Sequence, residues 1–341
     1  MFAKIEGIKV TAVAGCVSKN QKNLAEHTGG LLSESDIKRF NKKTGFVKLS
    51  ITGENTTAFD LCCRAAENLL QKGNIKKEEI DAVIFVTTSP DYQLPNNSSI
   101  MQHRLGLSNN VVTFDINQGC PGFVQGLYTS SCLIAGGGVN KVLLCVGDTR
   151  SKNTNPTDRA TRPLFGDAGT ATLIERGDNT LYFTAETYGE YFDKIIIRNG
   201  GARNKKASEN ENNYNDNYIS MDGWGMTNFV LEHAVPSLKN LLETYSINNE
   251  DLEMILIHQA NKVFSKTIAE QLGLEYDKVP FLAANYGNTG ATSIPLALSG
   301  LTDTKRGSFS KMCLCSFGCG LSIAIAITDL TDTQFLGIDK V

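Results

Sequence analysis

Cys120 is the residue whose neighbours point most directly to chemistry. It follows the strand-like run Val111–Asp115 and a polar Asn-Gln-Gly link, and it stands immediately before Pro121-Gly122. Proline favours the first position of a helix because its missing N–H is not needed there. The thiol is therefore expected at a helix N-terminus, where free N–H groups and the helix dipole stabilise a thiolate. Cys120 is a candidate nucleophile, with a buried structural cysteine as the alternative.

Two further polar residues occupy comparable places. His258 closes the apolar run Met254–His258, and open α/β sheets place their sites at the carboxyl ends of strands. The alternative for His258 is a hydrogen-bonded histidine of the core. Asn288 lies between glycines in Tyr286–Gly290, where an ordinary turn asparagine is the alternative.

Cys120 and Asn288 hold equivalent positions because the chain repeats itself. Each half contains a buried strand, a helix that ends in Leu-Gly-Leu, one of these two residues, a second helix and another strand. Pseudo-twofold packing of the halves would bring the two helix starts together. We predict a first half over residues 1–177, which carries the nucleophilic cysteine, and a second half over residues 178–341, which carries His258 and Asn288.

The elements that must position these residues follow from hydrophobic periodicity. Apolar runs of strand length alternate with longer amphipathic segments, as in α/β proteins with buried strands. The predicted strands are Ile8–Gly15, Ala82–Thr87, Val111–Asp115, Lys141–Gly147, Ala171–Glu175, Met254–His258, Lys311–Ser316 and Leu321–Thr328. The predicted helices are Thr57–Lys72, Ser98–Leu105, Pro121–Ala135, Thr227–Tyr245, Lys262–Leu272 and Thr292–Leu301. Ser18–Phe46 is expected to be an irregular surface cap over the site.

Composition and charge exclude several classes of function. The chain has 341 residues and a formal net charge of -3, which gives no electrostatic footprint for nucleic acid or an anionic membrane. The N-terminus lacks the core of a signal peptide, and the apolar stretch Met312–Ile327 is too short to span a bilayer. Nine cysteines without a paired CxxC set indicate a reducing cytoplasm, mostly structural thiols and no metal site.

Two glycine clusters complete the set of candidate features. One is Leu164–Gly169, which precedes a strand, and the other is Phe317–Gly320, which interrupts one. Glycine permits a close backbone approach and leaves N–H groups free to donate. Neither cluster fits a dinucleotide-binding loop or a P-loop, so no nucleotide cofactor is expected.

Taken together, five motifs resemble the β-ketoacyl-acyl-carrier-protein synthase III family of condensing enzymes. They are GCPGF, FGDAGTA, IHQAN, NYGNTGAT and SFGCG, in the family's order and approximate spacing over nearly the whole chain. The resemblance implies a thiolase-like, duplicated α-β-α-β-α fold of five layers, a homodimer and a Cys–His–Asn triad. Carried over by position, the triad is Cys120, His258 and Asn288.

The resemblance also implies a reaction. Cys120 takes an acyl group from an acyl-CoA or acyl-carrier-protein thioester, and backbone N–H groups of Cys120 and Cys319 hold the oxyanion. His258 and Asn288 hold the enolate that forms when malonyl-acyl carrier protein loses CO₂, and a β-ketoacyl product leaves. Neither a metal nor a redox cofactor is expected, and the pathway is fatty acid biosynthesis or a specialised one.

The chain departs from the family pattern in recognisable places. The segment Ile37–Gly45 lacks the tryptophan that stacks on coenzyme A in the family, and Leu94 replaces a phenylalanine that gates the partner subunit's acyl pocket. A smaller gate admits a different or longer acyl chain. Trp224 is expected in the core, with the substrate tunnel as the alternative. Thr88 stands where hydroxymethylglutaryl-CoA synthases carry a catalytic glutamate, which argues against that reaction.

Two other functions stay open at this point. The same fold could move an acyl group to an oxygen or nitrogen nucleophile, which would release no CO₂ from a malonyl thioester. The chain could also be a non-catalytic partner subunit, although such subunits generally lose the nucleophile and this chain keeps Cys120.

Overall fold

The computed structural model describes residues 1–301 and 309–341, which form eight α-helices and thirteen strands. The helices are α1 (Leu24–Thr28), α2 (Glu34–Thr44), α3 (Ala58–Lys72), α4 (Asn97–Leu105), α5 (Gly122–Ala135), α6 (Gly223–Thr244), α7 (Lys262–Leu272) and α8 (Ser293–Ser299). The strands are β1 (Phe2–Val17), β2 (Gln21–Asn23), β3 (Lys48–Ser50), β4 (Ala82–Val86), β5 (Val112–Ile116), β6 (Lys141–Thr149), β7 (Asp167–Thr187), β8 (Ile195–Ile196), β9 (Ser220–Met221), β10 (Met254–Ile257), β11 (Met312–Gly318), β12 (Ser322–Thr328) and β13 (Gln334–Lys340).

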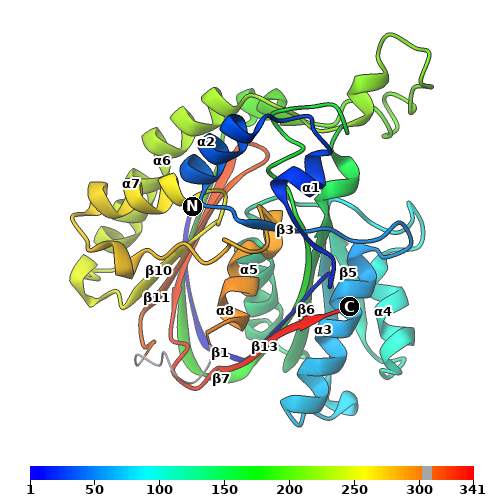
Figure 1. Cartoon of the computed structure of the whole chain (residues 1–341). Helices are drawn as coiled ribbons and strands as arrows, with labels where there is room; N and C mark the ends of the chain where they lie inside the picture. The colour runs from blue at the N-terminus through cyan, green and yellow to red at the C-terminus, as the bar shows by residue number, and fades with distance from the viewer. Residues whose placement is uncertain (302–308) are drawn as a thin grey trace.

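Helices and sheet alternate in layers. Figure 1 shows α5 and α8 in the centre, between a sheet layer with β10 and β11 and another with β6 and β5. Helices α6 and α7 cover the first layer from outside, and α3 and α4 cover the second. The predicted duplicated α-β-α-β-α arrangement is confirmed.

Strand pairing repeats between the two halves. The main sheet runs in the order β10-β11-β12-β7-β6-β4-β5. Strands β10 and β11 are parallel and β12 is antiparallel to β11, whereas β4 and β6 are parallel and β7 is antiparallel to β6. The two halves therefore share one pattern of pairing, as the repeated sequence predicts.

Strand β7 connects the halves. Its first part, Asp167–Glu175, pairs with β6, and its last part, Tyr182–Thr187, pairs with β12. Strand β1 runs antiparallel along both parts, and β13 pairs with the end of β1. The predicted boundary between residues 177 and 178 stays a prediction, and it falls inside β7.

The buried strands read as continuous apolar runs because helices cover both of their faces. The central core cluster contains Phe123 and Leu127 of α5 with Ile294 and Leu298 of α8. Separate clusters lie under α3 with α4 and under α6 with α7. Cysteines of the outer clusters are packed as small apolar residues, and burial raises the pKa of Cys315 to about 12.

Some predictions about local structure were wrong. Ser18–Phe46 contains the helix α2, whose N-cap Ser33 accepts from the Asp36 N–H and whose C-cap Gly45 is left-handed. Strand β7 extends far beyond Ala171–Glu175. The prediction missed its second part, because the residues there vary between burial and exposure and form no continuous apolar run. Trp224, which was predicted to lie in the core, is 77% exposed. It stands in the first turn of α6, and the buried residues of that helix begin only at Phe229.

None of the helices built from residues 1–301 and 309–341 is both long enough and apolar enough to cross a membrane.

Gly166→Ala is expected to lower the free energy of unfolding by about 1–3 kcal/mol, because the added methyl would overlap the Tyr286 carbonyl oxygen. Gly189→Ala is the matched control, since nothing lies within 4 Å of its added Cβ, and it should change stability by under about 0.5 kcal/mol. Urea denaturation followed by circular dichroism measures both. Equal midpoints for the two variants would contradict the close approach.

Candidate active site

Cys120 lies in a tight turn between β5 and α5. The Gly122 N–H donates to the Gly119 carbonyl oxygen at 2.8 Å, and α5 begins at Gly122. A Cβ on Gly122 would lie 2.5 Å from Cγ1 of Val86, so the start of α5 packs directly on the end of β4. The predicted place of the thiol, just before a helix, is confirmed.

A second turn, between β11 and β12, presses against the first. A Cβ on Gly318 would lie 2.6 Å from Cβ of Cys120, and a Cβ on Gly119 would lie 2.6 Å from Sγ of Cys319. Gly318 also has a φ of 156°, a conformation that L side chains rarely adopt. Glycine at both positions therefore lets Cys120 and Cys319 approach each other across the two halves of the chain.

The contact sets the charge of Cys120. A hydrogen bond from the Cys319 side chain lowers the pKa of Cys120 to about 7, against burial, which raises it. The positive charge of Arg150 and the Cys319 backbone N–H lower it further. The same hydrogen bond, together with burial, holds the pKa of Cys319 well above its usual value. Near neutral pH Cys120 therefore exists in part as a thiolate, whereas Cys319 remains a thiol.

His258 follows β10 and is buried. Its Nδ1 lies 2.7 Å from Oγ of Ser293, and its ring meets Phe317 edge to face with the centroids 5.7 Å apart. Burial lowers the pKa of His258 to about 3, and the positive charge of Arg150 acts in the same direction. His258 is therefore a neutral imidazole at physiological pH.

The residues after His258 hold it in place. The side chain of Gln259 donates to the Ile257 carbonyl oxygen at 2.8 Å and accepts from the Leu282 N–H at 2.7 Å. Asn261 caps α7 by accepting from the Phe264 N–H at 3.1 Å. The IHQAN motif thus ties the end of β10 to the loop before Asn288 and to the next helix.

Asn288 sits in a turn that is fixed by backbone contacts. Its N–H donates to the Leu164 carbonyl oxygen at 2.9 Å, and its carbonyl oxygen accepts from the Gly166 N–H at 3.0 Å. Its side-chain Oδ1 accepts from the Gly290 N–H at 3.0 Å. Because the side-chain oxygen is engaged in the turn, the amide Nδ2 is left as the donor. The close approach predicted for the Leu164–Gly169 cluster is confirmed at Gly166.

Arg150 belongs to the site and was not singled out in the sequence. It follows β6, is 4% exposed and forms an ion pair with the buried Asp148 at 3.4 Å. A Cβ on Gly290 would lie 2.5 Å from Nε of Arg150, and a Cβ on Gly119 would lie 3.5 Å from its Nη2. The guanidinium therefore lies between the Cys120 turn and the Asn288 turn. The signal in the sequence was a pair of charged residues directly after the apolar run Val142–Gly147.

The structure brings Cys120, Cys319, His258 and Asn288 together around Arg150, but it leaves Leu94 outside. Leu94 is 87% exposed on the loop before α4. In a single chain it does not contribute to the buried site.

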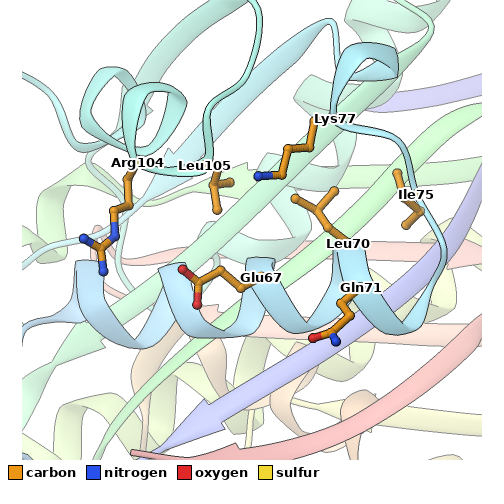
Figure 2. Close-up of a pocket in the computed structure, with 7 residues that line it drawn as sticks. All are labelled: Glu67, Leu70, Gln71, Ile75, Lys77, Arg104 and Leu105. Atoms are coloured by element: carbon orange, nitrogen blue, oxygen red, sulfur yellow. The ribbon is translucent and has the colours of Figure 1, made fainter.

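A surface hollow of about 310 Å³ lies elsewhere, between α3 and α4. Figure 2 shows Arg104 at one end of it and Ile75 at the other, with Glu67, Leu70 and Leu105 in the middle. Its lining residues are Glu67, Leu70, Gln71, Ile75, Lys77, Arg104 and Leu105. None of them belongs to the turns that carry Cys120, His258 and Asn288, so this hollow is separate from the candidate active site. Across residues 1–301 and 309–341, no group of three or more His, Cys, Asp or Glu is placed to hold a metal ion.

Comparisons with known proteins agree with this geometry. The family described as 3-oxoacyl-[acyl-carrier-protein (ACP)] synthase III matches residues 114–189, and its C-terminal part matches residues 242–330. A Campylobacter jejuni protein, provisionally named 3-oxoacyl-[acyl-carrier-protein] synthase 3, is 35% identical over 97% of this chain and 96% of its own. The β-ketoacyl-[acyl-carrier-protein] synthase III of Streptococcus sanguinis is 31% identical over 94% of this chain and 97% of its own.

A solved structure extends the likeness to the whole fold. The crystal structure of 3-oxoacyl-(acyl-carrier protein) synthase from Burkholderia xenovorans superposes with a TM-score of 0.93. It is 31% identical in sequence, and the match covers 100% of this chain and 99% of that one. The chain therefore belongs to the 3-oxoacyl-[acyl-carrier-protein] synthase III family of acyl-transferring condensing enzymes.

Proposed function

We propose that this chain condenses an acyl thioester with malonyl-acyl carrier protein, with loss of CO₂, through an acyl group carried on Cys120. The observation that carries the proposal is that one buried site favours an anionic cysteine and a neutral histidine. A large share of Cys120 is ionised near neutral pH, whereas His258 stays neutral. A condensing enzyme needs both, because it first attacks a carbonyl carbon and then has to donate hydrogen bonds to an enolate oxygen.

In the first step the Cys120 thiolate attacks the carbonyl carbon of the acyl thioester. The negative charge moves to the carbonyl oxygen, and we assign its stabilisation to the backbone N–H groups of Cys120 and Cys319. The Cys319 N–H already points to the Cys120 sulfur, which supports this assignment. The leaving thiolate of the donor departs, and Cys120 is left as a thioester.

In the second step the malonyl thioester loses CO₂ and becomes an enolate. We assign the Ser293 hydroxyl, 2.7 Å from Nδ1 of His258, as the donor to that nitrogen, which puts the proton of the neutral imidazole on Nε2. Nε2 of His258 and Nδ2 of Asn288 then donate to the enolate oxygen. The enolate carbon attacks the acyl carbonyl, the β-ketoacyl product leaves, and the thiolate of Cys120 is restored.

The surroundings of the reaction are part of the proposal. Each charge in the two steps is met by a side chain or a backbone N–H of this chain, so the proposed chemistry uses no metal or redox cofactor.

All nine cysteines are free, which supports a reducing cytoplasm. We also propose a homodimer in which Leu94 of each copy reaches the acyl group of the other. The exposure of Leu94 and its neighbour Tyr92 supports that contact.

Cys120→Ala is expected to abolish the acyl adduct and to slow condensation by roughly 10³-fold or more, because the nucleophile is lost. Intact-protein mass spectrometry against a panel of acyl-CoA and acyl-carrier donors, with CO₂ release as a second readout, measures both. Cys132→Ala, at an exposed cysteine outside the site, is the control. Ester or amide formation without CO₂ release would replace condensation with simple acyl transfer.

Alkylation of Cys120 by iodoacetamide should follow the thiolate, with a midpoint at pH of about 7. Cys319→Ala should move the midpoint to higher pH, because the hydrogen bond that favours the ionised form is lost. Cys319→Ser retains a donor and should keep the midpoint low. Peptide mass spectrometry, which separates Cys120 from the exposed Cys132, gives the rates. An unchanged midpoint in Cys319→Ala would contradict the assigned cause.

His258→Ala and Asn288→Ala are each expected to slow decarboxylation by roughly 10²–10³-fold, because a donor to the enolate oxygen is lost. Acylation of Cys120 should be much less affected, since the backbone holds the first oxyanion. Single-turnover assays of the two steps separate the effects, with His103→Ala on α4 as the control. Equal slowing of both steps would argue against the division of roles.

A further inference from the structure

The Asp148–Arg150 pair has hydrogen-bonding capacity that the protein does not use. Nε and Nη2 of Arg150 and Oδ2 of Asp148 are buried without a hydrogen-bond partner among the described residues. Arg150 is 4% exposed and Asp148 is fully buried. Buried polar atoms are nearly always paired, and each unpaired one costs free energy. Nη2 and Oδ2 face each other in the ion pair at 3.4 Å without a hydrogen bond, and Nε has none either, so a ligand could complete all three.

These atoms adjoin the place where an acyl group must sit. The guanidinium interacts with the sulfur atoms of both Cys120 and Cys319. It also touches the turn that carries Asn288, through the contact of Nε with Gly290. An acyl group on Sγ of Cys120 is consequently next to the pair.

Further contacts of Asp148 and Arg150 fix the orientation of the pair. Oδ1 of Asp148 accepts from the Thr88 N–H at 2.8 Å and from the Thr88 hydroxyl at 2.9 Å. The ring of Phe165 lies under the guanidinium, with its centroid 5.8 Å from Cζ of Arg150. These contacts fix the orientation of the pair.

Charge balance decides which group fits. Nε and Nη2 lie on the edge of a guanidinium that commonly binds a carboxylate. Here Asp148 already neutralises Arg150, so a further carboxylate would bury an uncompensated negative charge beside Oδ2. An alkyl group would leave all three atoms without a hydrogen bond. A hydroxyl accepts from the two nitrogens and donates to Oδ2, and so pairs them all.

We propose that the acyl group loaded onto Cys120 carries a hydroxyl, which binds between Arg150 and Asp148. The enzyme is then selective for hydroxyacyl thioesters over unsubstituted acyl thioesters of the same length. This inference rests on the proposed function, because it requires that Cys120 accept an acyl group.

The test compares four-carbon thioesters of N-acetylcysteamine on the full-length protein, which removes any contribution from the carrier. The probes are butyryl, 2-, 3- and 4-hydroxybutyryl, and succinyl thioesters, and intact-mass spectrometry follows acylation of Cys120. At least one hydroxybutyryl thioester should acylate Cys120 about 10-fold or more faster than butyryl, because only the hydroxylated acyl group gives the buried atoms of Arg150 and Asp148 hydrogen bonds. Faster reaction of butyryl than of every hydroxybutyryl probe overturns the proposal. Succinyl as the fastest probe overturns it in favour of a carboxylate.

Arg150→Met should bring the ratio of hydroxybutyryl to butyryl rates close to one. The ratio is the readout because loss of Arg150 also changes ionisation of Cys120, which affects both probes alike. Arg176→Met, at a residue that contacts Ile134 away from the site, is the control and should keep the wild-type ratio. An unchanged ratio in folded Arg150→Met contradicts the proposal. If that variant does not fold, the wild-type panel decides alone.

The outcomes separate this inference from the proposed function. If no thioester acylates Cys120, including acyl-CoA and acyl-carrier donors, then the proposed function itself fails. If butyryl is accepted as readily as the hydroxylated probes and is condensed with malonyl-acyl carrier protein, only the role of the Asp148–Arg150 pair is wrong.

Discussion

The contact between the Cys120 turn and the Gly318–Cys319 turn is the constraint on which the rest of the structure depends. The first turn belongs to the N-terminal half and the second to the C-terminal half, yet they meet too closely for a Cβ on Gly119 or Gly318. Such a contact survives only if the halves are held in one relative position. Strand β7 pairs with both β6 and β12, and β1 runs along its whole length, so a single sheet crosses the boundary. The catalytic site is thus a property of the joined halves and of neither alone.

Burial has opposite effects on the two titratable groups of the triad. It lowers the pKa of His258 to about 3, because a buried imidazolium cation is costly. The neutral imidazole that results can donate a hydrogen bond. It raises the pKa of a thiol, as at Cys315, so a buried thiolate needs specific support. Cys319 and Arg150 supply that support to Cys120. Arg150 also acts on His258 in the direction that burial does, so one cation favours both charge states that condensation requires.

The triad could be predicted from the sequence because Cys120 lies just before a helix, because His258 directly follows a buried strand, and because the repeat places Cys120 and Asn288 alike. The roles of Arg150 and of the Cys319 thiol could not, since they arise from contacts between segments more than a hundred residues apart. Arg150 reaches the site only because the end of β6 lies against the Asn288 turn. Helix α2 and strand β13 were missed for another reason. Both are largely exposed or half-buried, so they lack the apolar runs on which periodicity depends.

The presence of Asp148 is the feature that thiolate chemistry alone does not explain. A buried ion pair is costly, and apolar residues of similar volume are often as stable or more so. Stabilising the thiolate accounts for Arg150, but Asp148 opposes it, because its negative charge raises the pKa of Cys120. Once Cys120 carries an acyl group its charge is gone, and the guanidinium has lost one of its partners. A carboxylate oxygen that has no hydrogen bond is then useful to a ligand that donates as well as accepts. We therefore assign Asp148 a role in the acyl-enzyme only. Arg150 has a role both in the free enzyme, where it stabilises the thiolate, and in the acyl-enzyme.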